Sequence, residues 1–178
     1  MRPVVRKKIC MVGSYGVGKT SLVRRFVESI FDDRYLTNIG VKIDKKQIAA
    51  DDCDITLVIW DLAGEDEITK LRLSHLRGAA GYILVADGCR PATLQKAKEL
   101  QQRVRDHLGD VPFLLALNKS DLVDNWQVPP SELDRLRTRG WDCYQTSAKT
   151  GDATENLFQT LAFKMLNKSC NDGSGFRW

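Results

Sequence analysis

Near the N-terminus the sequence reads Ile9-Cys10-Met11-Val12-Gly13-Ser14-Tyr15-Gly16-Val17-Gly18-Lys19-Thr20. An apolar run, typical of a buried strand, leads into a loop with the spacing GxxxxGK[ST], which predicts a phosphate-binding loop between a strand and a helix. Its glycines let backbone N–H groups turn toward the oxygens of a triphosphate. We expect all of Gly13 to Thr20, and Ser21 after them, to bind nucleotide. Lys19 would reach the β- and γ-phosphates, and Thr20 would place its hydroxyl on Mg²⁺.

Length and composition are those of one globular domain. The chain has 178 residues and a net charge of +4. It contains no apolar run near the roughly 18 to 20 residues that span a bilayer, and no apolar signal-peptide core follows the charged start. The five cysteines form no CxxC pair, which favours reduced thiols. The basic residues form no stripe with aromatics, so nucleic-acid binding is not indicated. We expect a cytoplasmic protein.

Apolar strands alternate with helical stretches, which predicts an α/β fold with a mostly parallel sheet and helices on both faces. Ala49-Ala50-Asp51-Asp52 is too short for a crossover helix, so the second and third strands should form an antiparallel hairpin. The expected strands are Arg6–Val12, Val41–Ala50, Asp54–Trp60, Tyr82–Ala86, Phe113–Asn118 and Cys143–Thr146. The expected helices are Lys19–Glu28, Ile68–Arg77, Pro91–Leu108, Ser131–Arg139 with Ser131 as N-cap, and Ala153–Leu166.

Asp61-Leu62-Ala63-Gly64 follows the third expected strand. A carboxylate at the end of a strand beside the phosphate loop can hold Mg²⁺, commonly through water, which makes Asp61 a candidate metal ligand. The N–H of Gly64 can meet the γ-phosphate. Loss of that phosphate would break this hydrogen bond and free the loop after it, as in an order-to-disorder switch.

Asn118-Lys119-Ser120-Asp121 ends the fifth expected strand and is typical of a base-reading element. Guanine presents donors at N1 and N2, and Asp121 can accept both, whereas adenine offers no such pair. Asn118 would brace the loop and Lys119 would lie over the ring. From Thr146-Ser147-Ala148-Lys149, the Ala148 N–H would donate to guanine O6, and we expect Ser147 and Lys149 to line the same site. The pattern favours GTP over ATP.

Together these motifs resemble those of the Ras-superfamily small GTPases, most of all the Rab-like members, including those found in bacteria. The resemblance runs from about Arg6 to Leu166, and Trp60-Asp61-Leu62-Ala63-Gly64 is similar to the WDTAG of Rab proteins. It implies a P-loop G domain with a six-stranded sheet, one strand antiparallel, and about five helices. It also implies a GTP-on, GDP-off switch, and it places Phe31 against the guanine.

Departures from the family pattern fall on catalysis. The family's water-orienting Gln corresponds to Glu65, whose carboxylate cannot donate an amide hydrogen bond and whose charge opposes the developing phosphate charge. We therefore expect slow unaided hydrolysis, with Lys19, Gly64 and Glu65 as the catalytic set. Bulky Tyr15 should crowd the γ-phosphate and obstruct an arginine supplied by an activating partner.

The first switch loop also departs from the pattern. The family's Mg²⁺-binding threonine corresponds to Asn38, with Thr37 one residue earlier, and either residue can complete the metal site. In the same loop Arg34 is a candidate catalytic cation, and Tyr35 is a candidate to close over the nucleotide.

We expect a G domain over residues 1–168 and a flexible tail over 169–178, which shows no terminal cysteine motif for stable lipid anchoring. Exchange factors, activating proteins and effectors would bind residues 31–41 and 63–77. Two functions remain open from the sequence. The first is a slow GTP-hydrolysing switch, and the second is a nucleotide-binding interaction module with little turnover. They share every binding residue and differ in the hydrolysis rate.

Overall fold

A computed structural model describes residues 2–28, 35–36, 41–62 and 73–171, with side chains at 2–28, 41–62 and 73–168. Its strands are β1 (Val4–Val12), β2 (Tyr35–Leu36), β3 (Val41–Ala49), β4 (Asp54–Leu62), β5 (Gly81–Asp87), β6 (Phe113–Asn118) and β7 (Cys143–Gln145). Its helices are α1 (Lys19–Val27), α2 (Leu73–Leu76), α3 (Pro91–Leu108), the 3-10 turn η2 (Val123–Asn125), α4 (Pro130–Thr138) and α5 (Thr154–Asn171).

The strands form one mixed sheet in the order β2-β3-β4-β1-β5-β6-β7. β1 pairs in parallel with both β4 and β5, whereas β3 pairs antiparallel with β4 across the short link expected from the sequence. Among the described strands β3 alone runs against the others, which confirms the mostly parallel sheet with one antiparallel strand. The two-residue β2 adds a seventh strand at the β3 edge.

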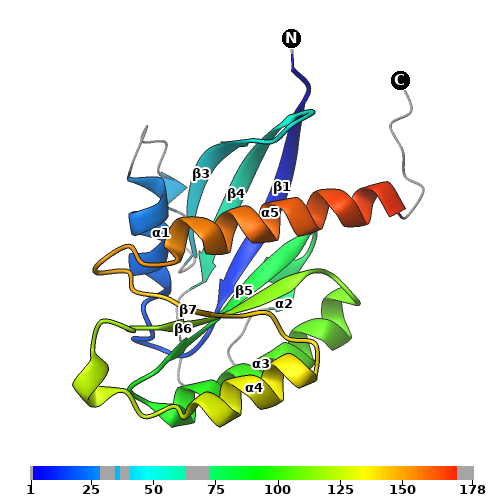
Figure 1. Ribbon diagram of the computed structural model, residues 1–178. Helices are drawn as coiled ribbons and strands as arrows, with labels where there is room; N and C mark the ends of the chain where they lie inside the picture. Colours follow the sequence, from blue (N-terminus) through cyan, green and yellow to red (C-terminus); the bar gives the residue numbers. More distant parts are fainter. Residues whose placement is uncertain (1, 29–34, 37–40, 63–72, 172–178) are drawn as a thin grey trace.

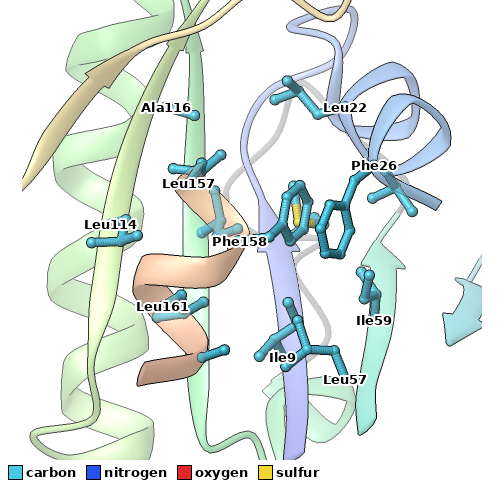
Figure 2. Close-up of a cluster of buried hydrophobic side chains, with 14 of the residues drawn as sticks. Ile9, Leu22, Phe26, Leu57, Ile59, Leu114, Ala116, Leu157, Phe158 and Leu161 are labelled. Carbon is cyan, nitrogen blue, oxygen red and sulfur yellow. The ribbon is translucent and has the colours of Figure 1, made fainter. Parts of the chain in front are cut away.

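Helices cover both faces of the sheet (Figure 1). One apolar cluster lies between the sheet and α1 and α5, and the other lies between the sheet and α2, α3 and α4. All seven residues of β5 are buried, as expected for a parallel strand covered on both faces. Figure 2 shows the first cluster, where the Phe26 ring of α1 stacks on the Phe158 ring of α5 with centroids 4.1 Å apart.

The start of α4 and the end of α5 differ from the helix ends expected from the sequence. Pro129, not Ser131, is the N-cap of α4, so the expected serine cap was wrong, and Pro130 occupies the first turn. Proline suits that position because its missing N–H would have no partner there. α5 continues to Asn171 because no breaker follows Leu166. None of the described helices is both long and apolar enough to cross a bilayer.

Candidate functional site

The predicted motifs meet at the carboxyl edge of the parallel strands. Gly13 follows β1, Asp61 lies at the end of β4, and Asn118 ends β6. The chain passes from β1 to the β3–β4 side of the sheet and then returns to β5 on the other side of β1. In open α/β sheets such a reversal of strand order forms a crevice at the carboxyl ends of the strands, where ligands bind.

The phosphate loop takes a backbone path that its glycines permit. Gly16 and Gly18 have φ of 69° and 100°, a region that L side chains rarely adopt. A Cβ at Gly13 would lie 2.3 Å from the Val85 carbonyl oxygen, and one at Gly18 would lie 2.2 Å from Asn118 Nδ2. The loop is therefore pressed against β5 on one side and against Asn118 on the other.

Lys19 is folded back over this loop. Its Nζ donates to the carbonyl oxygens of Gly13 and Ser14, each at 2.8 Å, and the residue is only 5% exposed. Burial lowers the pKa of Lys19 to about 8, and the charge of Asp61 acts in the opposite direction. A buried ammonium held by neutral carbonyls is well placed to accept an anionic partner, since its charge is only partly compensated.

Thr20 and Asp61 are joined by a hydrogen bond of 2.5 Å from Thr20 Oγ1 to Asp61 Oδ2. The other carboxylate oxygen, Oδ1, is buried and has no hydrogen-bond partner. Burial raises the pKa of Asp61, while the Thr20 hydrogen bond and the Lys19 charge lower it. An unpartnered carboxylate oxygen beside a hydroxyl fits a hard cation such as Mg²⁺. Among the described residues, no cluster of three His, Cys, Asp or Glu could hold a metal.

The Asn118–Asp121 motif lines a pocket of about 450 Å³ that also reaches the phosphate loop. Asn118 is among the residues that line it. Its Nδ2 donates to the Val17 carbonyl at 3.0 Å, and its Oδ1 accepts from Thr146 Oγ1 and the Ala148 N–H, each at 3.2 Å. The Ala148 N–H, expected on guanine O6, is thus held by Asn118 here. The pocket is lined by Gly18, Ser21, Asn118, Lys119, Asp121, Leu122, Ala148 and Lys149.

Asp121 and Lys119 are both held by partners. Asp121 Oδ1 accepts from Ser147 Oγ at 2.6 Å, which orients the carboxylate. Lys119 adopts a φ of 69°, and its Nζ lies 2.7 Å from Asp87 Oδ2 at the end of β5. Sequence reasoning missed Asp87, although a polar residue directly after an apolar strand was the same signal that identified Asp61 and Asn118.

Arg90 is a second residue that the motifs did not reveal. Its Nε donates to Asp87 Oδ2 at 2.9 Å and its Nη2 donates to the Tyr15 carbonyl at 3.2 Å. Arg90 therefore joins the start of α3 to the phosphate loop. The Tyr15 side chain itself is 68% exposed. No sequence signal pointed to Arg90, because its contact with the Tyr15 carbonyl joins residues that are 75 positions apart in the chain.

The structure thus places four groups of predicted site residues at one edge of the sheet: the phosphate loop, Asp61, Asn118–Asp121 and Ser147–Lys149. Other predicted positions lie outside the described residues: Phe31, Arg34, Thr37, Asn38, Gly64 and Glu65. Tyr35 lies in β2, where only its backbone is described.

Comparison with known proteins agrees with this geometry. The model of the Ras family matches residues 8–167. The chain is 32% identical to "Ras-related protein Rab-8B" of Homo sapiens over 172 residues, which cover 94% of this chain and 83% of the relative. It is 31% identical to "Ras-related protein Rab-13" of Mesocricetus auratus over 170 residues, covering 94% and 84%. The chain belongs to the Ras family and is a Rab-like member of the Ras-superfamily small GTPases.

Proposed function

We propose that this protein is a guanine-nucleotide switch that binds GTP or GDP with Mg²⁺ and slowly hydrolyses GTP. The observation that supports this most directly is the pocket lined by the phosphate-loop residue Gly18 and by the base-reading residues Asp121 and Ala148. One continuous hollow between a phosphate loop and a base-reading loop suits a single nucleotide, with its phosphates at one end and its base at the other.

The phosphates would be held by backbone N–H groups of residues 13–20, by Lys19, and by the N-terminus of α1, which begins at Lys19. Binding would draw Lys19 Nζ from the Gly13 and Ser14 carbonyls toward the β- and γ-phosphates. Thr20 and Asp61 would hold Mg²⁺, with Asn38 or Thr37 completing the protein ligands. When bound, the metal neutralises charge on the phosphate oxygens.

The base would be read by Asp121, which accepts from N1 and N2 of guanine, while Lys119 lies over the ring. The Ala148 N–H would exchange its bond to Asn118 for one to guanine O6. Asn118 keeps its bond to the Val17 carbonyl and so holds the phosphate loop and the base loop at a constant separation. Phe31, which is not among the described residues, would also contact the base.

Slow hydrolysis is proposed from Glu65 in place of the family's Gln. A carboxylate repels the charge that develops on the transferring phosphoryl group and offers no amide donor. The chain would still position a water molecule in line with the γ-phosphate, and Lys19 and the Gly64 N–H would bind the γ-phosphate oxygens. Regulators and effectors would read residues 31–41 and 63–77.

The test is single-turnover hydrolysis of preloaded GTP with Mg²⁺, comparing wild type with Glu65→Gln and Tyr15→Gly. Slow but measurable turnover that Glu65→Gln accelerates would support the proposal. Tight GTP binding without any turnover, in wild type and both variants, would favour the alternative of a nucleotide-binding interaction module. Asp121→Asn should shift preference from guanine to xanthine nucleotides, because the xanthine carbonyl at C2 accepts where guanine donates.

A further inference from the structure

Arg25 on α1 contacts the loop that follows β7. Its Nη2 donates to the Thr150 carbonyl oxygen at 2.8 Å. The next residue, Gly151, has a φ of +87°, and a Cβ there would lie 2.6 Å from both Nε and Nη2 of Arg25. A side chain at residue 151 would therefore require the guanidinium to shift from this position.

Behind this contact the loop holds Ser147 by two of its atoms. The Gly151 N–H donates to the Ser147 carbonyl at 2.8 Å, and the Thr150 N–H donates to Ser147 Oγ at 3.1 Å. The Thr150 carbonyl and the Gly151 N–H belong to one peptide unit. A cation on the carbonyl therefore strengthens the N–H as a donor to Ser147, and it fixes the plane of that peptide.

Ser147 in turn donates from Oγ to Asp121 Oδ1 at 2.6 Å. Because Thr150 occupies one acceptor site of this hydroxyl, the proton of Ser147 is directed toward the carboxylate. A continuous path of side chains and peptides thus runs from Arg25 to the group that we propose reads guanine.

The path begins on the helix whose first residues are Lys19 and Thr20. Arg25 lies on the same helix, so its bond to Thr150 attaches the base-reading loop to the element that bears the phosphate-binding residues. Asn118 makes a comparable attachment inside the protein through the Val17 carbonyl. Arg25 makes it at the surface, about two helical turns away from Lys19.

We infer that Arg25 is a positioning residue for base recognition. By holding Thr150 and Gly151 it keeps Ser147 and Asp121 oriented, and so it raises the preference for guanine and slows nucleotide release. The inference rests on the proposed function, in which Asp121 accepts from guanine N1 and N2. A merely structural Arg25 would change the stability of the protein without changing which base it prefers.

The experiment measures dissociation constants for GDP and for inosine diphosphate, with Mg²⁺, on the full chain. Inosine lacks the 2-amino group, so the ratio of the two constants reports how well Asp121 is placed. We expect Arg25→Ala to lower the preference for GDP by about 3- to 10-fold, the effect of one charge-assisted hydrogen bond at an exposed site. Arg25→Lys should restore most of it, because an ammonium still donates to Thr150.

Two further variants serve as a control and as a second disruption of the same contact. Arg24→Ala removes the neighbouring exposed arginine, for whose side chain no partner is found among the described residues, and should leave the ratio unchanged. Gly151→Ala should lower the ratio at least as much as Arg25→Ala does, because its Cβ displaces the guanidinium and an alanine is also strained at this φ. A ratio equal to wild type in both Arg25→Ala and Gly151→Ala would overturn the inference.

Asp121→Asn distinguishes a failure of the role proposed for Arg25 from a failure of the role proposed for Asp121. If it abolishes the preference for GDP while Arg25→Ala keeps it, only the role of Arg25 fails. If Asp121→Asn itself keeps the full preference, the assignment of Asp121 as the base reader fails, and the role of Arg25 fails with it.

Discussion

Lys119 Nζ lies 2.7 Å from Asp87 Oδ2, so the lysine of the Asn118–Asp121 motif is anchored to the carboxyl end of β5. Asp87 is 1% exposed and also accepts hydrogen bonds from Arg90 Nε and from the Cys89 N–H. One buried carboxylate therefore joins the start of α3 to the loop after β6, and Arg90 links the same carboxylate to the Tyr15 carbonyl of the phosphate loop.

Asp87→Asn should change how stability depends on pH. Burial alone would raise the pKa of Asp87, but Lys119, the Cys89 N–H and Arg90 together hold it below the ordinary value of 3.8. A carboxyl group whose pKa is lower in the folded state stabilises the folded protein. This stabilisation is complete at pH values above the pKa of the unfolded state, and it is lost as the pH falls through the pKa of the folded state. The free-energy difference between wild type and Asp87→Asn should thus be constant near neutrality and shrink below pH about 4.

Urea unfolding of both proteins without nucleotide, at a series of pH values, checks this expectation. We expect Asp87→Asn to lower the free energy of unfolding at pH 7 by about 1–3 kcal/mol, since its two cationic partners are partly exposed and regain water. A difference that stays the same down to pH about 2 would contradict the role given to the ionised carboxylate.

Arg90→Ala should accelerate nucleotide release. The variant removes the bond to the Tyr15 carbonyl and one partner of Asp87, which loosens the phosphate loop against α3. For one hydrogen bond at a half-exposed site we expect GDP dissociation to be faster by about 2- to 10-fold. Displacement of labelled GDP by excess unlabelled GDP measures it. Lys96→Ala, on the same helix, is the control and should match wild type, and equal rates in both variants would refute the attachment.

Phe158→Ala should be among the most destabilising substitutions in α5. Its ring is buried and stacks on Phe26 with centroids 4.1 Å apart, so truncation leaves a cavity between α1 and α5 (Figure 2). We expect a loss of about 3–5 kcal/mol in the free energy of unfolding. Phe163→Ala on the same helix removes a ring that is 41% exposed and should cost about 1 kcal/mol or less. Comparable losses for the two variants, by urea unfolding, would contradict the packing described.

Cys10 should resist alkylation in the folded protein. It is fully buried in β1, and burial raises its pKa to about 12 despite the opposing charge of Lys8. The thiolate is the reactive form, so both access and ionisation are suppressed. Iodoacetamide labelling at pH about 8, followed by peptide mass spectrometry, should modify the half-buried Cys53 before Cys10. If Cys10 in the folded protein were labelled as fast as in the protein unfolded in urea, the burial described for β1 would be contradicted.

The sequence alone determined the motifs and the elements that present them. An apolar run located β6, and a helical stretch that begins at Pro91 and precedes Gly109 located α3, both at their observed bounds, because burial and helix-terminating signals act over a few neighbouring residues. The same local chemistry predicted roles for Lys19, Thr20, Asp61, Asn118 and Asp121, since binding a phosphate, a cation or a base edge demands particular side chains at particular spacings.

Only the tertiary structure decided the contacts that hold those residues in place. Two-residue β2 exists because β3 offers it a partner, and nothing in Tyr35–Leu36 itself predicts a strand. Asp87, Arg90 and Arg25 act on groups that lie far from them along the chain, such as the Tyr15 and Thr150 carbonyls. A hydrogen bond requires two atoms within about 3 Å. Which distant atoms meet is set by strand order and helix packing, not by any local pattern.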